Sequence, residues 1–257
     1  MKTVLIKCGG SVLDELTSSF FSSLKDLEKQ GYRLLFVHGG GPDINKMLDL
    51  YNIEHEFVNG LRKTTAEAME IVEMVLSGKT NRKLAAMLNA NGFKAFGLNG
   101  SDAKVLQAEF IDEEKLGFVG DIKKVNIEAI SMLLNDNYTP VITPIASGEN
   151  GMRLNVNADY AAVAIAKALN ADHFLFVTDV DGIMIDGQVV QQIDTDEIDK
   201  YIIDKQITGG MIPKVKSAIG AIESGLQSVR IVSGKNPFFE GDQWNGTVIK
   251  AGEKVYK

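Results

Sequence analysis

Short apolar runs alternate with longer amphipathic segments along most of this chain, and that alternation constrains its fold more than any other feature. Five of the apolar runs have the length and composition of buried strands: residues 3–6, 33–37, 139–142, 173–177 and 228–232. Four of the amphipathic segments have the spacing of helices: residues 16–29, 42–50, 157–169 and 211–223. Strands that take turns with helices in this way predict an α/β fold with a mainly parallel sheet.

The middle of the chain is less regular. We expect three helices and two hairpins there: helices over 65–76, 81–89 and 127–134, one hairpin built on 54–58, and one that pairs 104–110 with 117–125. A length of 257 residues allows one large domain or two modest lobes. We place a lobe boundary near residue 170, between a lobe of 1–170 and a lobe of 171–257.

Composition and charge exclude several classes of protein. Cys8 is the only cysteine, so no disulfide forms within the chain, which suits a reducing cytosol. No secretory signal opens the chain, and no apolar stretch approaches the roughly 20 residues of a membrane helix. The net charge of −7 disfavours broad attraction to nucleic acid. We therefore expect a cytoplasmic protein that binds neither membranes nor nucleic acids.

Glycine-rich segments directly follow the first two predicted strands. Residues 7–11, Lys-Cys-Gly-Gly-Ser, offer bare backbone N–H groups and a lysine to a phosphate, although a tight turn explains them equally well. Residues 38–42, His-Gly-Gly-Gly-Pro, favour an anion at a helix N-terminus over a flexible connector. Ligands collect outside the carboxyl ends of strands in such sheets, so both loops are predicted to face one crevice. We interpret His38 as a packed or capping residue rather than a catalyst.

Two further motifs contain groups suited to a small anionic substrate. Arg62 can pair with a carboxylate through two hydrogen bonds. Taken alone, however, it is better explained as a surface arginine that precedes a helix whose N-cap residue is Thr64. Alternation puts Asn155 and Asn157 on one side of an extended segment, with Asp159 in the first turn of the next helix. Without other motifs, helix capping by Asn157 explains that pattern somewhat better than ligand binding.

The C-terminal half has two motifs of its own. Asp179 and Asp181 follow a buried strand, where they could hold Mg²⁺ through water or contact a nucleotide. Alternatively, they belong to an Asp-Gly turn that opens a hairpin. Gly209 and Gly210 precede a helix that has Lys214 in its first turns. A cation near a helix N-terminus is repelled by the helix dipole, so a purely structural role for Lys214 is disfavoured. An anion bound at this helix end would explain why a lysine is there.

Several common site patterns fail. Residues 77–80, Ser-Gly-Lys-Thr, resemble the end of a Walker A loop, but Glu73 stands where its first glycine is required. The segment after His38 does not complete a dinucleotide fingerprint, because Ile44 occupies the last glycine position. The three histidines and one cysteine lack zinc-site spacing, so we predict no metal bound by the protein itself.

Taken together and in this order, the motifs resemble the amino acid kinase family over nearly the whole chain. The resemblance rests on four segments: Lys7-x-Gly9-Gly10, the loop at 39–41, the loop at 178–182, and Gly209-Gly210-Met211 with Lys214. It implies a three-layer αβα sandwich around a mainly parallel sheet, as in carbamate kinase-like folds. It also implies phosphoryl transfer from ATP-Mg in the C-terminal lobe to an acceptor in the N-terminal lobe, which also forms the dimer.

Residues 60–64 and 155–159 resemble the family members that phosphorylate N-acetyl-L-glutamate, the second step of arginine synthesis. The product of that reaction is N-acetyl-L-glutamyl 5-phosphate, and the Mg²⁺ is bound mainly through the nucleotide. The resemblance implies that Lys7 and Lys214 contact the phosphates, that Asp159 orients both lysines, and that Gly10, Gly40 and Gly41 supply backbone donors. It also implies that Arg62 and Asn155 bind the acetylated amino acid. The nucleotide site would consist of Lys7, Gly9, Asp179, Gly209, Gly210, Met211 and Lys214.

The chain departs from its relatives at two places. Lys63 follows Arg62 where many relatives have an apolar residue, and this extra cation either alters substrate affinity or points outward. The chain also begins directly at the first predicted strand, whereas arginine-inhibited relatives have an additional N-terminal helix that builds a hexamer. We therefore expect a homodimer that is insensitive to arginine.

Three other interpretations stay open at this point. The acceptor can be that of another family member: glutamate 5-kinase, carbamate kinase, uridylate kinase or an aspartokinase catalytic domain. A non-catalytic sensor on the same fold would keep the glycine loops and could dispense with Lys7, Asp159 and Lys214, so the presence of all three argues against it. A dehydrogenase is weaker still, because the dinucleotide fingerprint fails.

Overall fold

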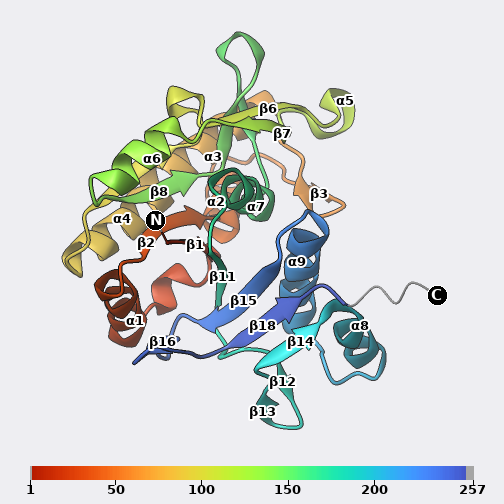
Figure 1. Cartoon of the computed structure of the whole chain (residues 1–257). Helices are drawn as coiled ribbons and strands as arrows, with labels where there is room; N and C mark the ends of the chain where they lie inside the picture. The colour runs from red at the N-terminus through yellow and green to blue at the C-terminus, as the bar shows by residue number, and fades with distance from the viewer. Residues whose placement is uncertain (1, 253–257) are drawn as a thin grey trace.

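An eight-stranded sheet runs through the middle of the protein in the computed structural model, which describes residues 2–252 (Figure 1). Its strand order is β14-β18-β15-β11-β1-β2-β8-β5. The strands are β1 (Thr3–Cys8), β2 (Arg33–His38), β5 (Ala95–Asn99), β8 (Thr139–Thr143), β11 (His173–Thr178), β14 (Gln192–Asp194), β15 (Ser228–Ser233) and β18 (Thr247–Lys250). Only the pairing of β15 with β18 is antiparallel, which confirms the mainly parallel sheet.

Helices cover both faces of this sheet. One apolar core packs the sheet against α6 (Glu128–Asn135), α7 (Ala158–Leu169), α8 (Thr195–Ile203) and α9 (Met211–Glu223). A second core packs the other face against α1 (Ser18–Lys29) and α4 (Asn81–Ala90). The alternation of β1 shows how one strand serves both, since Leu5 belongs to the first core and Ile6 to the second. The predicted αβα sandwich is therefore confirmed.

Smaller elements flank the main sheet. A four-stranded sheet of order β10-β9-β6-β7 lies beside the main sheet (Figure 1). Its strands are β6 (Leu106–Phe110), β7 (Gly120–Val125), β9 (Ile145–Ser147) and β10 (Arg153–Asn155), and the short helix α5 (Glu113–Leu116) separates β6 from β7. Three hairpins pair β3 (Phe57–Val58) with β4 (Leu61–Arg62), β12 (Met184–Ile185) with β13 (Gln188–Val189), and β16 (Phe239–Glu240) with β17 (Gln243–Trp244).

One helical stretch differs from the sequence-based expectation. Two separate helices were expected over 65–76 and 81–89, but α3 (Ala66–Glu73) continues into a π-helical segment, Met74–Thr80, and then directly into α4. Gly78, which marks a break in the sequence pattern, lies inside this π-helix and a Cβ there would meet open space. Together with α2 (Gly41–Leu50), α3 and the π-helical segment form a third apolar cluster, whereas α4 packs in the second core.

Other elements were missed or misplaced. The edge strands β5 and β14, the inner strand β18 and the helix α8 were not predicted, and the hairpin expected over 54–58 begins only at Phe57. Residues 2–252 include no helix with the length and apolar content needed to cross a membrane. One sheet extends through both expected lobes, and the lobe boundary near residue 170 stays a prediction.

The burial pattern of α2 makes a stability prediction. Leu48 is fully buried in the third cluster, whereas Leu50, on the same helix, is 71% exposed. We expect Leu48→Ala to lower the free energy of unfolding by about 2–5 kcal/mol, because it leaves a cavity. Leu50→Ala is the matched control and should change it by less than about 0.5 kcal/mol. Urea denaturation of both variants measures the difference, and equal losses would contradict the placement of α2.

Candidate active site

The two glycine loops touch each other through their backbones. A Cβ added to Gly10 would lie 2.7 Å from Cα of Gly40, and the Gly39 N–H donates to the Cys8 carbonyl at 3.0 Å. Because β1 and β2 are parallel neighbours, both loops emerge at the same edge of the sheet. The expected convergence of the loops is present, and Gly10 is a glycine because no side chain fits between them.

A lysine and an aspartate pair beside these loops. Lys7 Nζ lies 2.8 Å from Asp159 Oδ1. Asp159 belongs to the first turn of α7, where its N–H donates to the side chain of the N-cap residue Asn157 at 2.8 Å. Asn157 therefore caps the helix as the sequence suggested. The second carboxylate oxygen of Asp159 accepts from Ser217 Oγ at 2.9 Å, so residues from β1, α7 and α9 meet at one carboxylate.

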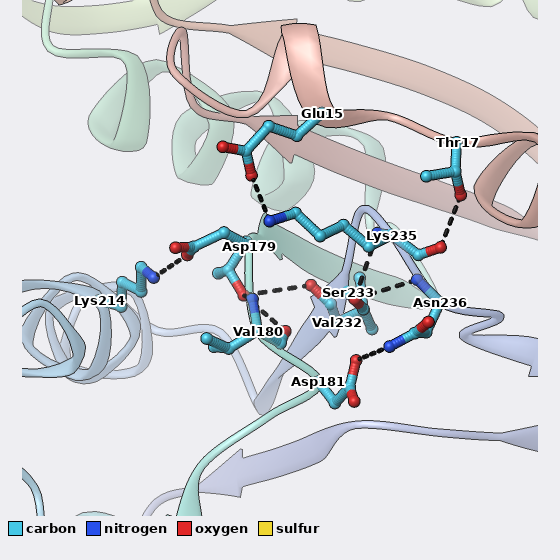
Figure 2. Close-up of polar contacts among 11 residues, drawn as sticks. Glu15, Thr17, Asp179, Val180, Asp181, Lys214, Val232, Ser233, Lys235 and Asn236 are labelled. Carbon is cyan, nitrogen blue, oxygen red and sulfur yellow. Dashed lines mark hydrogen bonds and ion pairs between the residues drawn. The ribbon is translucent and has the colours of Figure 1, made fainter.

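Lys214 binds a different carboxylate. Figure 2 shows its ammonium group directed at Asp179, to which it donates a hydrogen bond. This hydrogen bond lowers the pKa of Asp179 below its ordinary value. The resemblance assigned orientation of both lysines to Asp159, but in the structure Asp159 pairs with Lys7 while Asp179 holds Lys214.

The second aspartate of that loop points elsewhere. Asp181 accepts from Asn236 Nδ2 at 2.7 Å, on the side away from Lys214 (Figure 2). Thr178 fixes Val180, which lies between Asp179 and Asp181, because the Thr178 hydroxyl donates to the Val180 carbonyl at 2.9 Å. Each carboxylate thus already has a partner, and within residues 2–252 no three His, Cys, Asp or Glu side chains group as a metal site.

Both lysines line the same cavity despite their different partners. The cavity has a volume of about 210 Å³. Its lining includes Lys7, Gly9, Ser11, Asp159, Thr178, Lys214 and Ser217. Two cations, a glycine loop and three hydroxyl-bearing side chains are suited to the oxygens of a polyphosphate. Ser217 was missed in the sequence, although its position one helical turn after Lys214 is a usable signal.

Arg62 lines a second cavity of about 180 Å³ together with Gly39, Gly40, Gly41, Asn155 and Asn157. Arg62 is only 7% exposed, and this burial lowers the pKa of its guanidinium. Asn45 accepts a hydrogen bond from the guanidinium, which also stacks 4.6 Å from the ring centre of Phe57. The interpretation of Arg62 as a surface residue is therefore wrong.

The neighbours of Arg62 explain how it is held. Asn155 Nδ2 donates to Thr64 Oγ1 at 3.1 Å, and Thr64 in turn donates to the Arg62 carbonyl at 2.8 Å. Thr64 does not cap α3, since Thr65 is the N-cap residue. Lys63 pairs with Glu56 at 3.4 Å and lines a different surface hollow, so it points away from the Arg62 cavity.

The loop at 209–211 lies at the N-terminus of α9. Gly209 has φ +55°, and Gly210 is the N-cap residue. Within the described chain no side chain caps this helix end. Among residues 2–252, the linings of the two cavities include Pro213 and Lys214 but none of Gly209, Gly210 and Met211. The structure therefore brings these three near the lysine cavity without making them part of its wall.

The fold and these two cavities are those of a small-molecule kinase. A model of the amino acid kinase family matches residues 2–233, and the chain belongs to that family. It is 51% identical over 255 residues to the acetylglutamate kinase of Geobacillus sp. (strain WCH70), and the match covers 99% of each chain.

Solved structures agree with this fold. The protein smu.665 of Streptococcus mutans UA159 has a TM-score of 0.82 at 32% identity, covering 97% of this chain and 99% of that one. Carbamate kinase from Giardia lamblia, bound to AMP-PNP, has a TM-score of 0.64 at 18% identity, covering 98% and 99%. At that lower identity the likeness concerns the fold alone.

The contact between Lys214 and Asp179 predicts a titration effect. Lys214→Met removes the hydrogen-bonded cation, so the pKa of Asp179 should rise toward its ordinary value of about 3.9. A ¹³C NMR titration of the Asp179 carboxyl group measures this. Lys216→Met, on the exposed side of the same helix, is the matched control and should leave the titration unchanged.

The sign of the stability effect follows from the lowered pKa. Stabilisation from a depressed carboxyl pKa is present above the unfolded-state pKa and is lost as the pH falls through the folded-state value. The free energy of unfolding of Lys214→Met should therefore differ from wild type most near neutral pH and least in acid. An Asp179 titration that is identical in wild type and Lys214→Met would contradict the pairing.

Proposed function

We propose that the chain transfers the γ-phosphate of ATP to the side-chain carboxylate of N-acetyl-L-glutamate, giving N-acetyl-L-glutamyl 5-phosphate in cytoplasmic arginine biosynthesis. One observation carries this proposal: a cavity with two lysines and a cavity with a buried arginine lie against glycine loops that touch. The arrangement supplies cations to a polyphosphate on one side and to a carboxylate on the other. The name of the 51% identical relative supports the choice of acceptor.

The acceptor needs little activation. A side-chain carboxylate with a pKa of about 4.3 is ionised at neutral pH, so no general base is required. The difficulty is bringing an anion to a triphosphate, and phosphoryl transfer depends mostly on positioning and charge stabilisation. Lys7 and Lys214 supply cations, and the amides of Gly10, Gly40 and Gly41 supply donors. Asp159, bound to Lys7 at 2.8 Å, keeps one of those cations aimed at the cavity.

Arg62 and Asn155 are assigned to the acetylated amino acid. Arg62 is held by Asn45 and stacked on Phe57, so its guanidinium is fixed before a carboxylate arrives. Its Nη1 is buried and has no hydrogen-bond partner within residues 2–252, which leaves a donor available for the substrate. Asn155 contributes an amide whose position is fixed by Thr64.

ATP and Mg²⁺ fit the C-terminal part of the site. Gly9 and Asp179 lie beside the lysine cavity, and the uncapped start of α9 at Gly209, Gly210 and Met211 offers N–H groups to a nucleotide. Asp179 and Asp181 are engaged by Lys214 and Asn236, so the protein offers no ready carboxylate cage. We therefore assign Mg²⁺ to the nucleotide phosphates, where its charge offsets that of the transferred group.

A homodimer is part of the proposal. β5 lies at the edge of the main sheet, and its exposed Phe96 packs against exposed Tyr138 with ring centres 6.3 Å apart. Met132 on α6 is also exposed. An edge strand with neighbouring apolar side chains suits contact with a second copy. A light-scattering mass equal to that of one chain would contradict the dimer.

Removing either lysine tests the phosphoryl-transfer step. We expect Lys7→Ala and Lys214→Ala each to lower kcat by about 10²–10³-fold, because each removes a charge that stabilises the transferring phosphoryl group. Both variants should keep the wild-type circular dichroism spectrum. Lys216→Ala is the matched control and should retain kcat. A coupled ADP-release assay measures all three, and near-normal kcat in both lysine variants would rule out the mechanism.

Replacing Arg62 tests the acceptor. We expect Arg62→Ala to raise KM for N-acetyl-L-glutamate by about 10-fold or more, since a charge-assisted hydrogen bond contributes roughly 1.5–3 kcal/mol. KM for ATP should change little, and Lys63→Ala, one residue away, should change neither. Assays with glutamate, carbamate, uridylate and aspartate in place of the acetylated acceptor decide between family members. A change confined to KM for ATP would contradict the assignment.

A further inference from the structure

His38 ends β2 immediately before the second glycine loop, and its imidazole is completely buried. The mechanism proposed above gives it no role. Its Nδ1 lies 3.2 Å from the Gly39 carbonyl oxygen. Its Nε2 lies 3.2 Å from Asn81 Nδ2 and 3.4 Å from Thr143 Oγ1. The imidazole thus connects the glycine loop to the start of α4 and the end of β8.

The partners determine which nitrogen holds the proton. A carbonyl oxygen only accepts, so Nδ1 donates to Gly39. Asn81 Nδ2 only donates, and it gives one hydrogen to the Val141 carbonyl at 2.8 Å and the other to Nε2. Nε2 therefore accepts and has no hydrogen. Burial, with Arg82 nearby, lowers the pKa of His38 to about 4, which keeps the ring neutral at physiological pH.

The peptide plane transmits this contact to the active site. The Gly39 carbonyl and the Gly40 N–H belong to one planar trans peptide and point in opposite directions. When His38 holds the carbonyl, the Gly40 N–H is directed away from His38. Gly40 N is also the atom that a Cβ on Gly10 would approach to 3.0 Å, so this amide lies where the two glycine loops meet.

The π-helical segment supplies the other half of the contact. The Ser-Gly-Lys-Thr motif that failed as a phosphate loop forms its end, so Thr80 is the last residue of the segment and Asn81 is the first of α4. Thr80 Oγ1 would lie 3.1 Å from a Cβ on Gly40, and Asn81 reaches His38. π-Helical turns occur often at functional sites. Thr80 therefore lies against Gly40, while the next residue, Asn81, binds the histidine that precedes the glycine loop.

We propose that His38 and Asn81 form a positioning pair that orients the peptide between Gly39 and Gly40, so that the Gly40 N–H can stabilise the transferred phosphoryl group. This inference rests on the proposed function, because the consequence of misorientation is slower phosphoryl transfer. His38 touches neither substrate in this scheme, and it acts only through the loop.

Two substitutions of His38 separate its two nitrogens. His38→Asn places an amide near Nδ1 and keeps the donor to Gly39, whereas His38→Gln places an amide near Nε2 and loses that donor. We expect His38→Gln to lower kcat by up to about 100-fold, as misplacement of a reacting group does, with KM for both substrates nearly unchanged. His38→Asn keeps the donor to Gly39 and loses only the contact with Asn81, so its kcat should lie between those of wild type and His38→Gln.

Asn89→Ala is the structural control. Asn89 lies on the same helix as Asn81, and its side chain anchors the helix to β5: Oδ1 accepts from the Ala95 N–H at 3.0 Å and Nδ2 donates to the Ala95 carbonyl at 3.3 Å. This variant should lower the melting temperature while leaving kcat unchanged, whereas Asn81→Ala should lower kcat. Equal kcat in His38→Asn and His38→Gln, or loss of kcat in Asn89→Ala, would overturn the positioning role.

A spectroscopic measurement does not depend on the reaction. In ¹⁵N NMR of the wild-type chain, Nδ1 of His38 should be protonated and Nε2 unprotonated throughout pH 6–8. The opposite tautomer or an imidazolium would overturn the inference even if every variant misfolds. Failure of the wild-type chain to phosphorylate any acceptor, with the expected tautomer present, would reject the proposed function separately.

Discussion

The backbone contact between Gly10 and Gly40 is the constraint on which the rest of the site depends. Strands β1 and β2 are hydrogen-bonded neighbours about 4.8 Å apart, so the loops that follow them meet only if no side chain intervenes. A Cβ on Gly10 would come within 2.7 Å of Cα of Gly40, closer than any relaxed contact allows. The bare backbone that packing requires here is also what lets an anion approach several N–H groups.

The cations around this contact differ in how firmly they are held. The side chains of Lys214 and Asp179 are 27% and 48% exposed, and exposed pairs contribute only about 0–1 kcal/mol, so Lys214 can exchange Asp179 for a phosphate at little cost. Lys7 and Asp159 are less exposed, and Ser217 orders the carboxylate further. Arg62 is fixed most firmly, between Asn45 and Phe57. The site therefore combines fixed cations with one that can move.

The sequence predicted what depends on local patterns. Strand and helix alternation predicted the sheet, and glycines after the first two strands predicted that their loops meet at one edge of it. Partner choice depends on distances between remote segments, which no pattern records. The contacts of Asp159 with Ser217 and of Arg62 with Asn45 therefore had to come from the fold. β5 was missed because it lies at the edge of the sheet, where a strand is exposed on one side and its composition is less apolar. β18 lies between β14 and β15 and was missed because its 4 residues form too short a run to stand out.

The π-helical segment shows why a failed motif can still matter. Successive residues of an α-helix are rotated by about 100°, so one extra residue in a wider turn changes the direction of every later side chain by that amount. Met74–Thr80 is such a turn, and it ends where Asn81 must face His38. A regular α-helix through these residues would direct Asn81 elsewhere and leave Nε2 of the buried imidazole with only the longer contact to the Thr143 hydroxyl. Ser-Gly-Lys-Thr thus influences the glycine loop by setting the register of the helix behind it rather than by wrapping a phosphate.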